Sequence, residues 1–329
     1  MKKIAINGMG RIGRASLKII LDNPELDLVA VNDIASIDNI AYLIKYDSVH
    51  GIFEKNVTIE NNNLIVNGKT IPFYSQRNPE DLPWKELDVD VVIESTGFFT
   101  KEEDAQKHVD AGAKVVVISG PTASGGVPTV VHGVNTKDGK NTIFSCASCT
   151  TNNISPVIEI LGRRIGIAKA IMTTVHANTS SNSTVDAPSK KTRMGRSGMN
   201  NLIPTSTGAA TATTKALPEY AGKFDGMAIR VPVAIGSVSD ITLVTARKTS
   251  KEELNQIFTE EASTARYKNV IRVTNDPIVS SDIVKDPHAA VIDLEMIKVV
   301  DGDLVKVLAW YDNEWGFANQ MIRQILTEV

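Results

Sequence analysis

A short apolar strand, a glycine-rich turn and a helix begin this chain, and this arrangement constrains the fold more than any other feature. Residues 3–7 are a strand-like apolar run, the sequence G-M-G-R-I-G follows at residues 8–13, and residues 11–21 carry apolar side chains at helical spacing. A second strand-like run, residues 26–32, leads to Asp33, which stands 20 residues after Gly13. This order predicts the first βαβ unit of a dinucleotide-binding domain.

Each key residue of this unit has a physical reason to bind a dinucleotide. Gly8 permits a tight turn, Gly10 lets the backbone approach a pyrophosphate, and Gly13 permits close packing of the helix on the strand. The helix N-terminus favours the negative charge of the pyrophosphate. Asp33 can accept a hydrogen bond from a ribose 2′-hydroxyl and would repel a 2′-phosphate, which predicts NAD as cofactor, with NADP as the alternative. The alternative interpretation is a glycine-rich turn that has only a structural role.

Strands and helices continue to alternate over the first third of the chain. Helical spacing at 37–46 and 102–110 and apolar runs at 89–93 and 114–118 indicate a parallel sheet with helices on both faces. The segment 57–73 interrupts the alternation, because apolar runs flank Asn67-Gly68, which is typical of a hairpin turn. We therefore expect a Rossmann-type, doubly wound α/β domain over residues 1–148.

The pattern changes after residue 148. A helix at 152–161 and a strand at 168–176 precede a polar loop, residues 177–201. The later extended segments are 226–233, 238–246, 289–300 and 304–311, with one helix, 251–265, among them. They predict a C-terminal α+β catalytic domain, residues 149–312, with a mostly antiparallel sheet. A final amphipathic helix within 313–329 is expected to return to the first domain.

Composition excludes several other classes of protein. The chain has 329 residues, a formal net charge of −3, 42% hydrophobic and 22% charged residues, which is typical of a folded globular protein rather than a disordered one. The small charge disfavours nucleic-acid binding through bulk charge, and no apolar run reaches the length of a membrane span. The two cysteines are too close in sequence to crosslink the chain, so we expect a reduced, cytoplasmic protein without a metal site.

Cys149 is the candidate nucleophile. It lies in S-C-A-S-C-T-T-N, residues 145–152, directly before a predicted helix, where the positive end of the helix dipole lowers the pKa of a thiol. A histidine would complete a nucleophile–base pair, and His176 is the best candidate because it ends an apolar strand beside the polar loop. Without this context, Cys149 would be interpreted as a small buried apolar residue and His176 as a strand-end histidine. Cys146 is assigned to packing.

Segments spread over nearly the whole chain resemble the glyceraldehyde-3-phosphate dehydrogenase family. They are I-N-G-M-G-R-I-G-R at 6–14, A-S-C-T-T-N at 147–152, T-V-H-A at 174–177, P-T-S-T-G-A-A at 204–210, M-A-I-R-V-P at 227–232 and W-Y-D-N-E-W-G at 310–316. The resemblance implies NAD-dependent oxidative phosphorylation of glyceraldehyde 3-phosphate to 1,3-bisphosphoglycerate, a reaction of glycolysis and gluconeogenesis. It also implies a homotetramer that requires neither nucleic acid nor a membrane.

The resemblance further implies roles for single residues. Cys149 would attack the aldehyde carbon, and His176 would assist its ionisation and take the hydroxyl proton. Hydride would pass to the nicotinamide, and inorganic phosphate would cleave the resulting thioester. Asn313 would hold the nicotinamide amide. The backbones of Arg11 and Ile12 would contact the pyrophosphate, and Arg77 and Ser119 would lie beside the adenine and ribose groups.

Two anion sites are implied as well. The site for the attacking phosphate would gather hydroxyls and backbone amides at helix starts, from Ser148, Thr150, Thr207 and Gly208. The site for the substrate phosphate would use Thr179 and Arg230, whose guanidinium supplies charge-assisted donors. In the loop after His176, Arg193 and Arg196 are the candidate arginines that face a phosphate.

The same loop keeps alternatives open. Asn178 and Ser181 stand where most relatives have a tyrosine and an acidic residue. This departure leaves an erythrose-4-phosphate dehydrogenase of the same family as one alternative. A non-catalytic dinucleotide- or RNA-binding protein is an alternative of another class, which the intact Cys149 and His176 disfavour.

Overall fold

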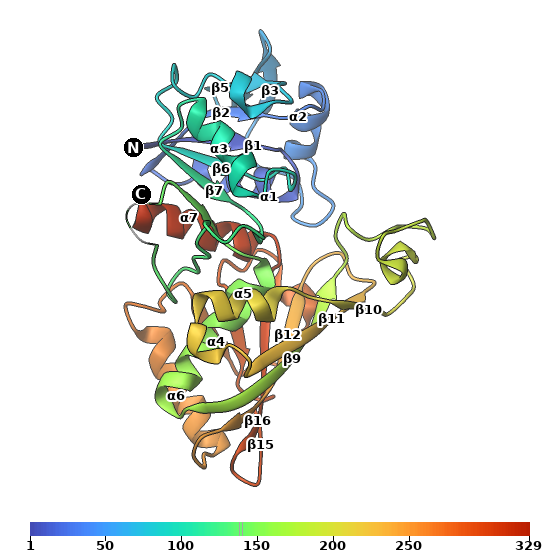
Figure 1. Ribbon diagram of the computed structural model, residues 1–329. Coiled ribbons are helices and arrows are strands. Elements are labelled where there is room, and N and C mark those ends of the chain that lie inside the picture. The colour runs from blue at the N-terminus through green and yellow to red at the C-terminus, as the bar shows by residue number, and fades with distance from the viewer. Residues whose placement is uncertain (138, 140) are drawn as a thin grey trace. The chain divides into compact units, whose positions relative to one another are not determined.

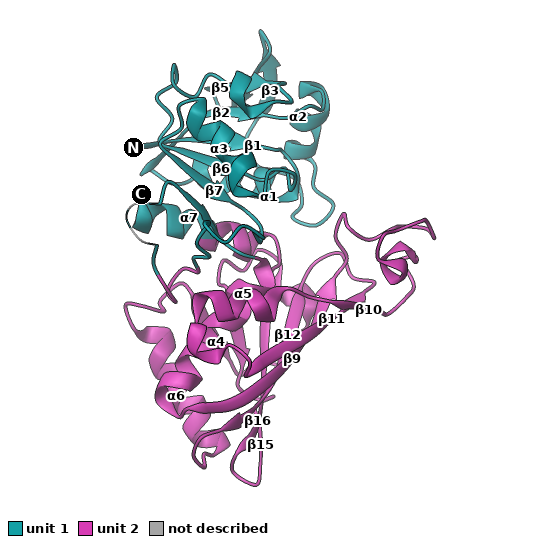
Figure 2. Ribbon diagram, viewed as in Figure 1, with its two compact units in different colours: residues 1–130, 136–147, 321–329 teal, residues 131–135, 148–320 magenta. Residues whose placement is uncertain are grey.

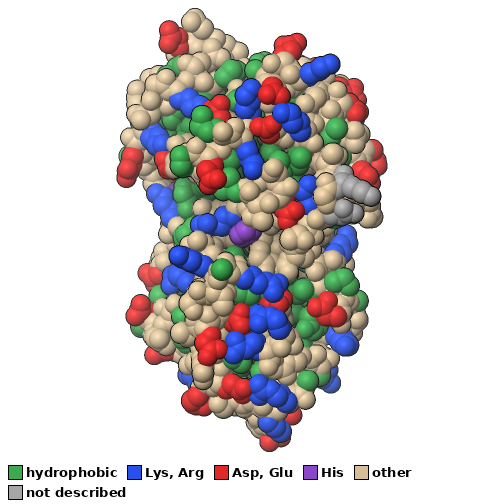
Figure 3. Space-filling model, turned by 90° about the vertical axis from the view of Figure 1, so that its left-hand side faces the viewer, with side chains coloured by type: hydrophobic (Ala, Val, Ile, Leu, Met, Phe, Trp, Pro, Cys, Tyr) green, Lys and Arg blue, Asp and Glu red, His purple; other side chains and the backbone are tan. Residues whose placement is uncertain are grey.

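The computed structural model describes residues 1–137, 139 and 141–329 (Figure 1). These residues form two compact units (Figure 2). Unit 1 comprises Met1–Val130, Thr136–Ala147 and Met321–Val329, and unit 2 comprises Val131–Asn135 and Ser148–Gln320. On the face drawn in Figure 3, acidic and basic side chains are interspersed, as the near balance of 35 basic and 38 acidic residues implies.

Unit 1 is built on an eight-stranded sheet with the strand order β3-β4-β5-β2-β1-β6-β7-β8. Its strands are β1 (Lys2–Asn7), β2 (Leu26–Asn32), β3 (Val57–Glu60), β4 (Asn63–Val66), β5 (Lys69–Tyr74), β6 (Val91–Glu94), β7 (Val115–Ile118) and β8 (Ile143–Ser145). β3, β4 and β5 pair antiparallel, and the other neighbours pair parallel. β1 lies between β2 and β6, so the winding reverses there, and ligands bind beyond the carboxyl ends of strands at such a point.

The helices of unit 1 connect these strands. They are α1 (Arg11–Leu21), α2 (Ile37–Lys45) and α3 (Glu102–Asp110), with a 3₁₀ turn, η1 (Pro79–Asp81). α1 packs against β1 and β2, and α3 packs against β7 and β8. An apolar cluster that includes Trp84, Val92, Ala105 and Val116 is completely buried beneath α3 and the adjoining strands. The doubly wound domain expected from the sequence is confirmed.

Unit 2 contains a second sheet, with the order β10-β11-β9-β12-β16-β14-β13 and with β15 paired to β16. Its strands are β9 (Ile167–Ala177), β10 (Ile203–Ser206), β11 (Phe224–Val231), β12 (Ser237–Thr245), β13 (Ile271–Thr274), β14 (Ala290–Asp293), β15 (Lys298–Val300) and β16 (Leu304–Tyr311). All neighbours pair antiparallel except β11 with β9 and β13 with β14. This confirms the mostly antiparallel sheet.

Four helices complete the fold. They are α4 (Cys149–Arg164), α5 (Ala209–Ala216), α6 (Lys251–Ser263) and α7 (Trp315–Glu328), with 3₁₀ turns η2 (Thr192–Gly195), η3 (Pro218–Tyr220) and η4 (Ser280–Ile283). α4 packs on β9, β12, β14 and β16, so it places its first residue, Cys149, over the strands that carry the other reactive side chains. The division between the two units falls within α7, after Gln320.

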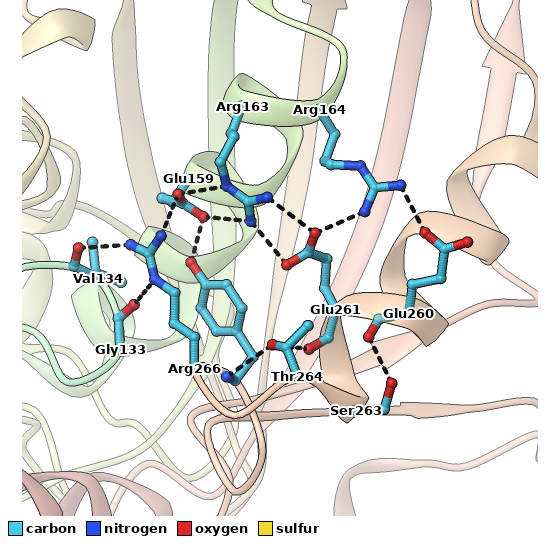
Figure 4. A network of polar contacts seen from close by, with 11 residues as sticks. Gly133, Val134, Glu159, Arg163, Arg164, Glu260, Glu261, Ser263, Thr264 and Arg266 are labelled. Carbon is cyan, nitrogen blue, oxygen red and sulfur yellow. Dashed lines mark hydrogen bonds and ion pairs between the residues drawn. The ribbon is translucent and has the colours of Figure 1, made fainter.

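A network of ion pairs holds the far end of α4 (Figure 4). The carboxylate of Glu261 on α6 accepts hydrogen bonds from Arg163 Nη2 and Arg164 Nη1, both 2.8 Å long. Glu159 accepts from Arg163 Nε at 2.9 Å and from Arg266 Nη1 at 2.8 Å. Cations at a helix C-terminus also interact favourably with the helix dipole. The network therefore fixes the C-terminal turn of α4 to α6 and to the segment after it.

The structure differs from the sequence prediction in several elements. α4 begins at Cys149 rather than near residue 152, because the Ser148 hydroxyl caps the helix by accepting the Thr151 N–H at 3.0 Å. The predicted strand 289–300 is two strands, β14 and β15. The region 57–73 forms three strands, β3, β4 and β5, and Asn67-Gly68 is the turn between β4 and β5. Four short elements, β8, β10, α5 and β13, are not predicted, because they are too short to show a clear hydrophobic period.

Candidate active site

A cavity of about 460 Å³ lies in unit 1 at the point where the winding of the sheet reverses. It is lined by the residues that directly follow four parallel strands. These are Gly8 and Gly10 after β1, Asp33 and Ile34 after β2, Gln76 and Arg77 after β5, and Ser95, Thr96, Phe98 and Phe99 after β6, with Asn7 and Asn32 from the strand ends. The carboxyl ends of parallel strands thus build the position where a doubly wound sheet binds its ligand.

Three glycines shape the entrance to α1. Gly8 has φ +94°, and a Cβ there would lie 2.6 Å from the Thr96 nitrogen. A Cβ on Gly13 would overlap the carbonyl oxygen of Gly8, so the helix could not approach the turn so closely. A Cβ on Gly10, by contrast, would meet no atom within 4 Å. The backbone of Gly10 therefore faces open space beside the N-terminus of α1, where a pyrophosphate fits.

Asp33 and the rim of the cavity suit the adenosine part of a dinucleotide. Its carboxylate accepts hydrogen bonds from the Met9 N–H at 2.6 Å and the Ala35 N–H at 2.8 Å. Each carboxylate oxygen has a further lone pair that a ribose hydroxyl can use. Ile34 is 59% exposed and Phe98 is 83% exposed, which leaves apolar surface that a planar base can cover. The residues present therefore fit NAD.

The other predicted cofactor residues lie around this cavity or behind it. The Arg11 guanidinium donates to Asp47 Oδ2 at 2.8 Å, so only its backbone belongs to the glycine-rich turn. Ile12 and Gly13 follow it in the first turn of α1. Arg77 is exposed in the lining. Ser119 follows β7, where its N–H donates to the Glu94 carbonyl oxygen at 2.9 Å, and it is not in the cavity lining.

A buried chain of polar side chains lies behind the cavity, and sequence reasoning missed it. Trp84 Nε1 donates to His108 Nδ1 at 3.0 Å, and His108 Nε2 lies 3.1 Å from the Glu94 carboxylate. Asn7 Nδ2 donates to the same carboxylate at 2.6 Å, and Asn7 Oδ1 accepts from Asn32 Nδ2 at 2.7 Å. Since an indole N–H only donates, the His108 proton is on Nε2 and points to Glu94. The sequence signal was a glutamate ending an otherwise apolar strand.

In unit 2, Cys149 and His176 lie together. Cys149 Sγ is 3.4 Å from His176 Nε2. Cys149 is the first residue of α4, and His176 is the penultimate residue of β9, with only 4% of its surface exposed. The structure therefore brings the two predicted reactive residues into contact.

The charge state of this pair differs from the sequence expectation. The helix dipole alone predicts a lowered pKa for the Cys149 thiol, but burial of the sulfur raises its pKa, and the Arg230 charge and hydrogen bonds from Thr150 only oppose this rise. Burial and the neighbouring Arg230 lower the pKa of His176 to about 4. Without an anion beside Arg230, the favoured state is therefore a neutral thiol beside a neutral imidazole.

Arg230 on β11 lies beside Nδ1, the other ring nitrogen of His176. Its Nη1 lies 2.7 Å from His176 Nδ1 and donates to the Ala177 carbonyl oxygen at 3.0 Å, while His176 Nδ1 is itself 2.7 Å from that oxygen. His176 Nδ1 therefore faces both a donor and an acceptor. If an anion draws the guanidinium away, Nδ1–H donates to Ala177, and the Nε2 lone pair is left to accept the Cys149 proton.

The residues predicted for the attacking phosphate lie at two helix starts. Ser148 caps α4, and Gly208, which is exposed, caps α5. The Thr207 hydroxyl accepts the Ala209 N–H at 3.2 Å. Thr150 differs, because it is buried and its hydroxyl lies 2.9 Å from the hydroxyl of Tyr311.

The residues predicted for the substrate phosphate lie on the loop after β9 and on β11. The Thr179 hydroxyl lies 2.9 Å from that of Ser181, and Asn178 Nδ2 donates to the Gly198 carbonyl oxygen across the loop. Arg196 pairs with Asp186 at 2.8 Å. Arg193 is exposed and forms no ion pair with any described residue.

Three further residues of unit 2 contact the site and were not singled out from the sequence. Ser237 Oγ accepts the Ala177 N–H at 3.1 Å and donates to Asn313 Oδ1 at 3.0 Å, which leaves the Asn313 amide nitrogen as the group that can donate elsewhere. Tyr311 and Thr174 share a hydrogen bond of 2.8 Å. Thr174 and Tyr311 lie in two of the segments that carry the family resemblance. Within those segments a hydroxyl in a strand is common, so nothing distinguished either residue.

Over the part of the chain that the structure describes, no helix is both long and apolar enough to cross a membrane. Within the same residues, no group of three or more His, Cys, Asp or Glu side chains is placed to hold a metal ion.

Comparison with known proteins gives consistent matches. Residues 2–102 match a family model described as glyceraldehyde 3-phosphate dehydrogenase, NAD binding domain, and residues 148–313 match the C-terminal domain of the same family. Glyceraldehyde-3-phosphate dehydrogenase 2 of Streptomyces avermitilis is 44% identical over 97% of this chain and 96% of its own. The enzyme of Zymomonas mobilis gives the same values. Glyceraldehyde-3-phosphate dehydrogenase 1 of Kluyveromyces lactis is 46% identical over 98% of both chains.

Proposed function

The chain belongs to the glyceraldehyde-3-phosphate dehydrogenase family, and from this premise we propose that it oxidises glyceraldehyde 3-phosphate with NAD and inorganic phosphate to 1,3-bisphosphoglycerate. One observation carries the proposal at the level of chemistry: Cys149 Sγ lies 3.4 Å from His176 Nε2 at the start of α4. A thiol in contact with a buried imidazole is the arrangement that covalent attack on a carbonyl needs.

Cys149 forms the covalent bond to the substrate. Because burial raises the pKa of its thiol, the thiolate forms by transfer of the proton to His176 rather than by loss to water. The imidazole of His176 is neutral at neutral pH, so its Nε2 lone pair is available for this proton, but its low pKa disfavours the transfer while the Arg230 charge is uncompensated. It returns the proton to the alkoxide of the thiohemiacetal and takes it again as the carbon is oxidised to the thioester.

Arg230 makes this proton transfer depend on a bound anion. The substrate phosphate, paired with Arg230, would neutralise the charge that disfavours a protonated His176. The attacking phosphate would meet donors at the starts of α4 and α5, from Ser148, Thr207 and Gly208. We assign Arg193 rather than Arg196 to a phosphate, because Arg196 is already paired with Asp186.

NAD, when bound, supplies the acceptor for the hydride that leaves the thiohemiacetal. We propose that residues 1–148, with the returning helix 313–329, form the domain that binds it and that residues 149–312 form the catalytic domain. Gly8, Gly10 and Gly13 give backbone access for the pyrophosphate, with Arg11 and Ile12 beside it. Asp33 holds the ribose, Arg77 and Ser119 flank the adenosine part, and Asn313 holds the nicotinamide amide.

One assay tests the proposed reaction. Purified protein is mixed with NAD and either glyceraldehyde 3-phosphate or erythrose 4-phosphate, with and without inorganic phosphate or arsenate. We expect reduction of NAD with glyceraldehyde 3-phosphate that requires the inorganic anion. Turnover of erythrose 4-phosphate that is indifferent to phosphate would favour the erythrose-4-phosphate dehydrogenase instead. NAD binding without turnover of either aldehyde would refute both enzymes and leave a binding protein.

We also infer that the protein works as a homotetramer in the cytoplasm, as its family resemblance implies. Sedimentation velocity of the purified protein measures its oligomeric state directly. A monomer at micromolar concentration would contradict the inference.

A further inference from the structure

The hydroxyl of Tyr311 lies between two threonines that neighbour the reactive pair. It is 2.9 Å from the Thr150 hydroxyl and 2.8 Å from the Thr174 hydroxyl. Thr150 follows Cys149 directly in the first turn of α4, and Thr174 stands two residues before His176 on β9. The exposed fractions of Tyr311, Thr150 and Thr174 are 1%, 4% and 0%. The hydroxyl of Tyr311 therefore joins the element that carries the nucleophile to the element that carries the base.

The pairing of the strands explains how a residue of β16 reaches β9. β12 lies between them, and Ser237 of β12 is paired with Tyr311 while Ser239 is paired with Thr174. Paired residues lie on the same face of a sheet, as do residues two apart on one strand. All four side chains therefore share the face under α4. The two serines are small and completely buried, so the Tyr311 ring crosses β12 without obstruction.

The ring makes a second contact with the site. It packs edge-on against the imidazole of His176, with ring centroids 6.0 Å apart at an interplanar angle of 78°. Burial raises the pKa of the Tyr311 hydroxyl, so it stays protonated. A protonated phenol donates one hydrogen bond and accepts others. It can therefore donate to one threonine and accept from the other, and both bonds are satisfied at once.

We propose that Tyr311 is a positioning residue, whose hydroxyl ties the first turn of α4 to β9 and thereby fixes the separation of Cys149 Sγ and His176 Nε2. The inference rests on the proposed function only in taking these two side chains as the reactive pair. The Tyr311 hydroxyl bonds to the two threonines rather than to the reacting atoms. It acts because proton transfer between sulfur and nitrogen is sensitive to small changes of their separation.

The test measures the reactivity of the Cys149 thiol, which requires neither aldehyde nor NAD. The rate of alkylation by iodoacetamide is followed across pH, and the labelled cysteine is identified by mass spectrometry, with Cys149→Ser as the blank. In Tyr311→Phe the ring stays but both hydrogen bonds are lost. We expect the alkylation rate near neutral pH to fall about tenfold, with the midpoint of the pH profile moved upward. The affinity for NAD should not change.

Two further variants decide between positioning and general stability. Thr174→Val removes one of the two bonds with little change of shape, and we expect a smaller shift in the same direction. The double variant Tyr311→Phe/Thr174→Val should alkylate no more slowly than Tyr311→Phe alone, because both changes break the same bridge. Tyr267→Phe is the matched control. It removes another buried tyrosine hydroxyl of unit 2, one that bonds to Glu159 instead, and should lower Tm without changing the pH profile.

A pH profile of Tyr311→Phe that superimposes on that of the unaltered protein would overturn the proposal, whatever happens to Tm. If Tyr311→Phe does not fold, an unchanged profile in Thr174→Val overturns it equally. An altered profile in a protein that turns over no aldehyde would support the positioning role while refuting the proposed reaction.

Discussion

The cofactor cavity of unit 1 and the reactive pair of unit 2 are assembled in different ways. The glycine turn and Asp33 come from one segment, residues 8–33, and their geometry is mainly that of the backbone. The pair in unit 2 combines the first residue of α4 with the end of β9, and strands β11 and β16 supply its neighbours. A site built from backbone can be recognised in one short segment of the sequence. A site built from side chains depends on which strands pair, and only its most reactive members can be recognised beforehand.

The largest expected effect is on the chemistry of the reactive pair, and it leaves the cofactor cavity unchanged. Cys149→Ser should lower the rate of aldehyde oxidation by at least about 1000-fold, because an uncharged hydroxyl is a far weaker nucleophile. The Kd for NAD, measured by fluorescence titration, should stay within about twofold, since no part of the unit 1 cavity changes. Cys146→Ser is the control and should keep its activity. Retained oxidation by Cys149→Ser would refute the assignment of Cys149 as the nucleophile. Loss of NAD binding in this variant would show that the reactive pair and the cofactor cavity are not independent.

A pair of glycine variants tests the backbone construction of unit 1. Gly13→Ala should lower the free energy of unfolding by about 2–3 kcal/mol, because its Cβ would overlap the Gly8 carbonyl oxygen. Gly10→Ala should leave stability unchanged but weaken NAD binding about tenfold, since its Cβ meets no protein atom and would stand where the pyrophosphate approaches. Chemical denaturation and NAD titration measure the two effects. Equal losses of stability in both variants would contradict the assignment.

Because the unit 2 site buries the side chain of His176, the stability of the protein depends on pH. Since the pKa of His176 is lowered to about 4 from 6.5, the unfolded chain binds a proton in that interval and the folded one does not. Its contribution to stability is thus complete above pH 6.5 and is lost as the pH falls toward 4. From about pH 7.5 to about pH 5, the free energy of unfolding should fall about 2 kcal/mol less in His176→Asn than in the unaltered protein. Parallel pH profiles would show that His176 is not buried in its neutral form.

The smallest expected effect is that of Asp33→Ala on the preference for NAD over NADP. Loss of the carboxylate removes both the ribose acceptor and the repulsion of a 2′-phosphate, so the ratio of kcat/KM for NAD over NADP should fall about fivefold. Asp33→Asn is the matched control, because it keeps an oxygen to accept the Met9 N–H while removing the charge. An unchanged ratio in both variants would mean that the carboxylate does not select the cofactor.

The sequence predicts the parts of this molecule whose physics is local. The helix Arg11–Leu21 and the strand Leu26–Asn32 have the predicted bounds, because hydrophobic period and turn chemistry agree there. Cys149 and His176 could be named because of their chemistry and their places at the ends of elements. Tyr311, Thr174 and Ser237 could not, since their roles arise from the register of β9, β12 and β16. The direction of the Cys149 pKa could not either, because burial depends on the whole fold.

Helix α4 is fixed at both of its ends. Its first turn is bound through Thr150 to Tyr311, and its last turn is bound through Arg163 and Arg164 to α6. Because its 16 residues span about 24 Å, these two anchorages hold opposite ends of the helix. The nucleophile cannot be shifted to suit a longer or shorter substrate without disturbing both anchorages. Evolution of new substrate preference on this scaffold is therefore expected to proceed by remodelling the surface loop 177–201, while α4 and the Cys149 sulfur stay in place.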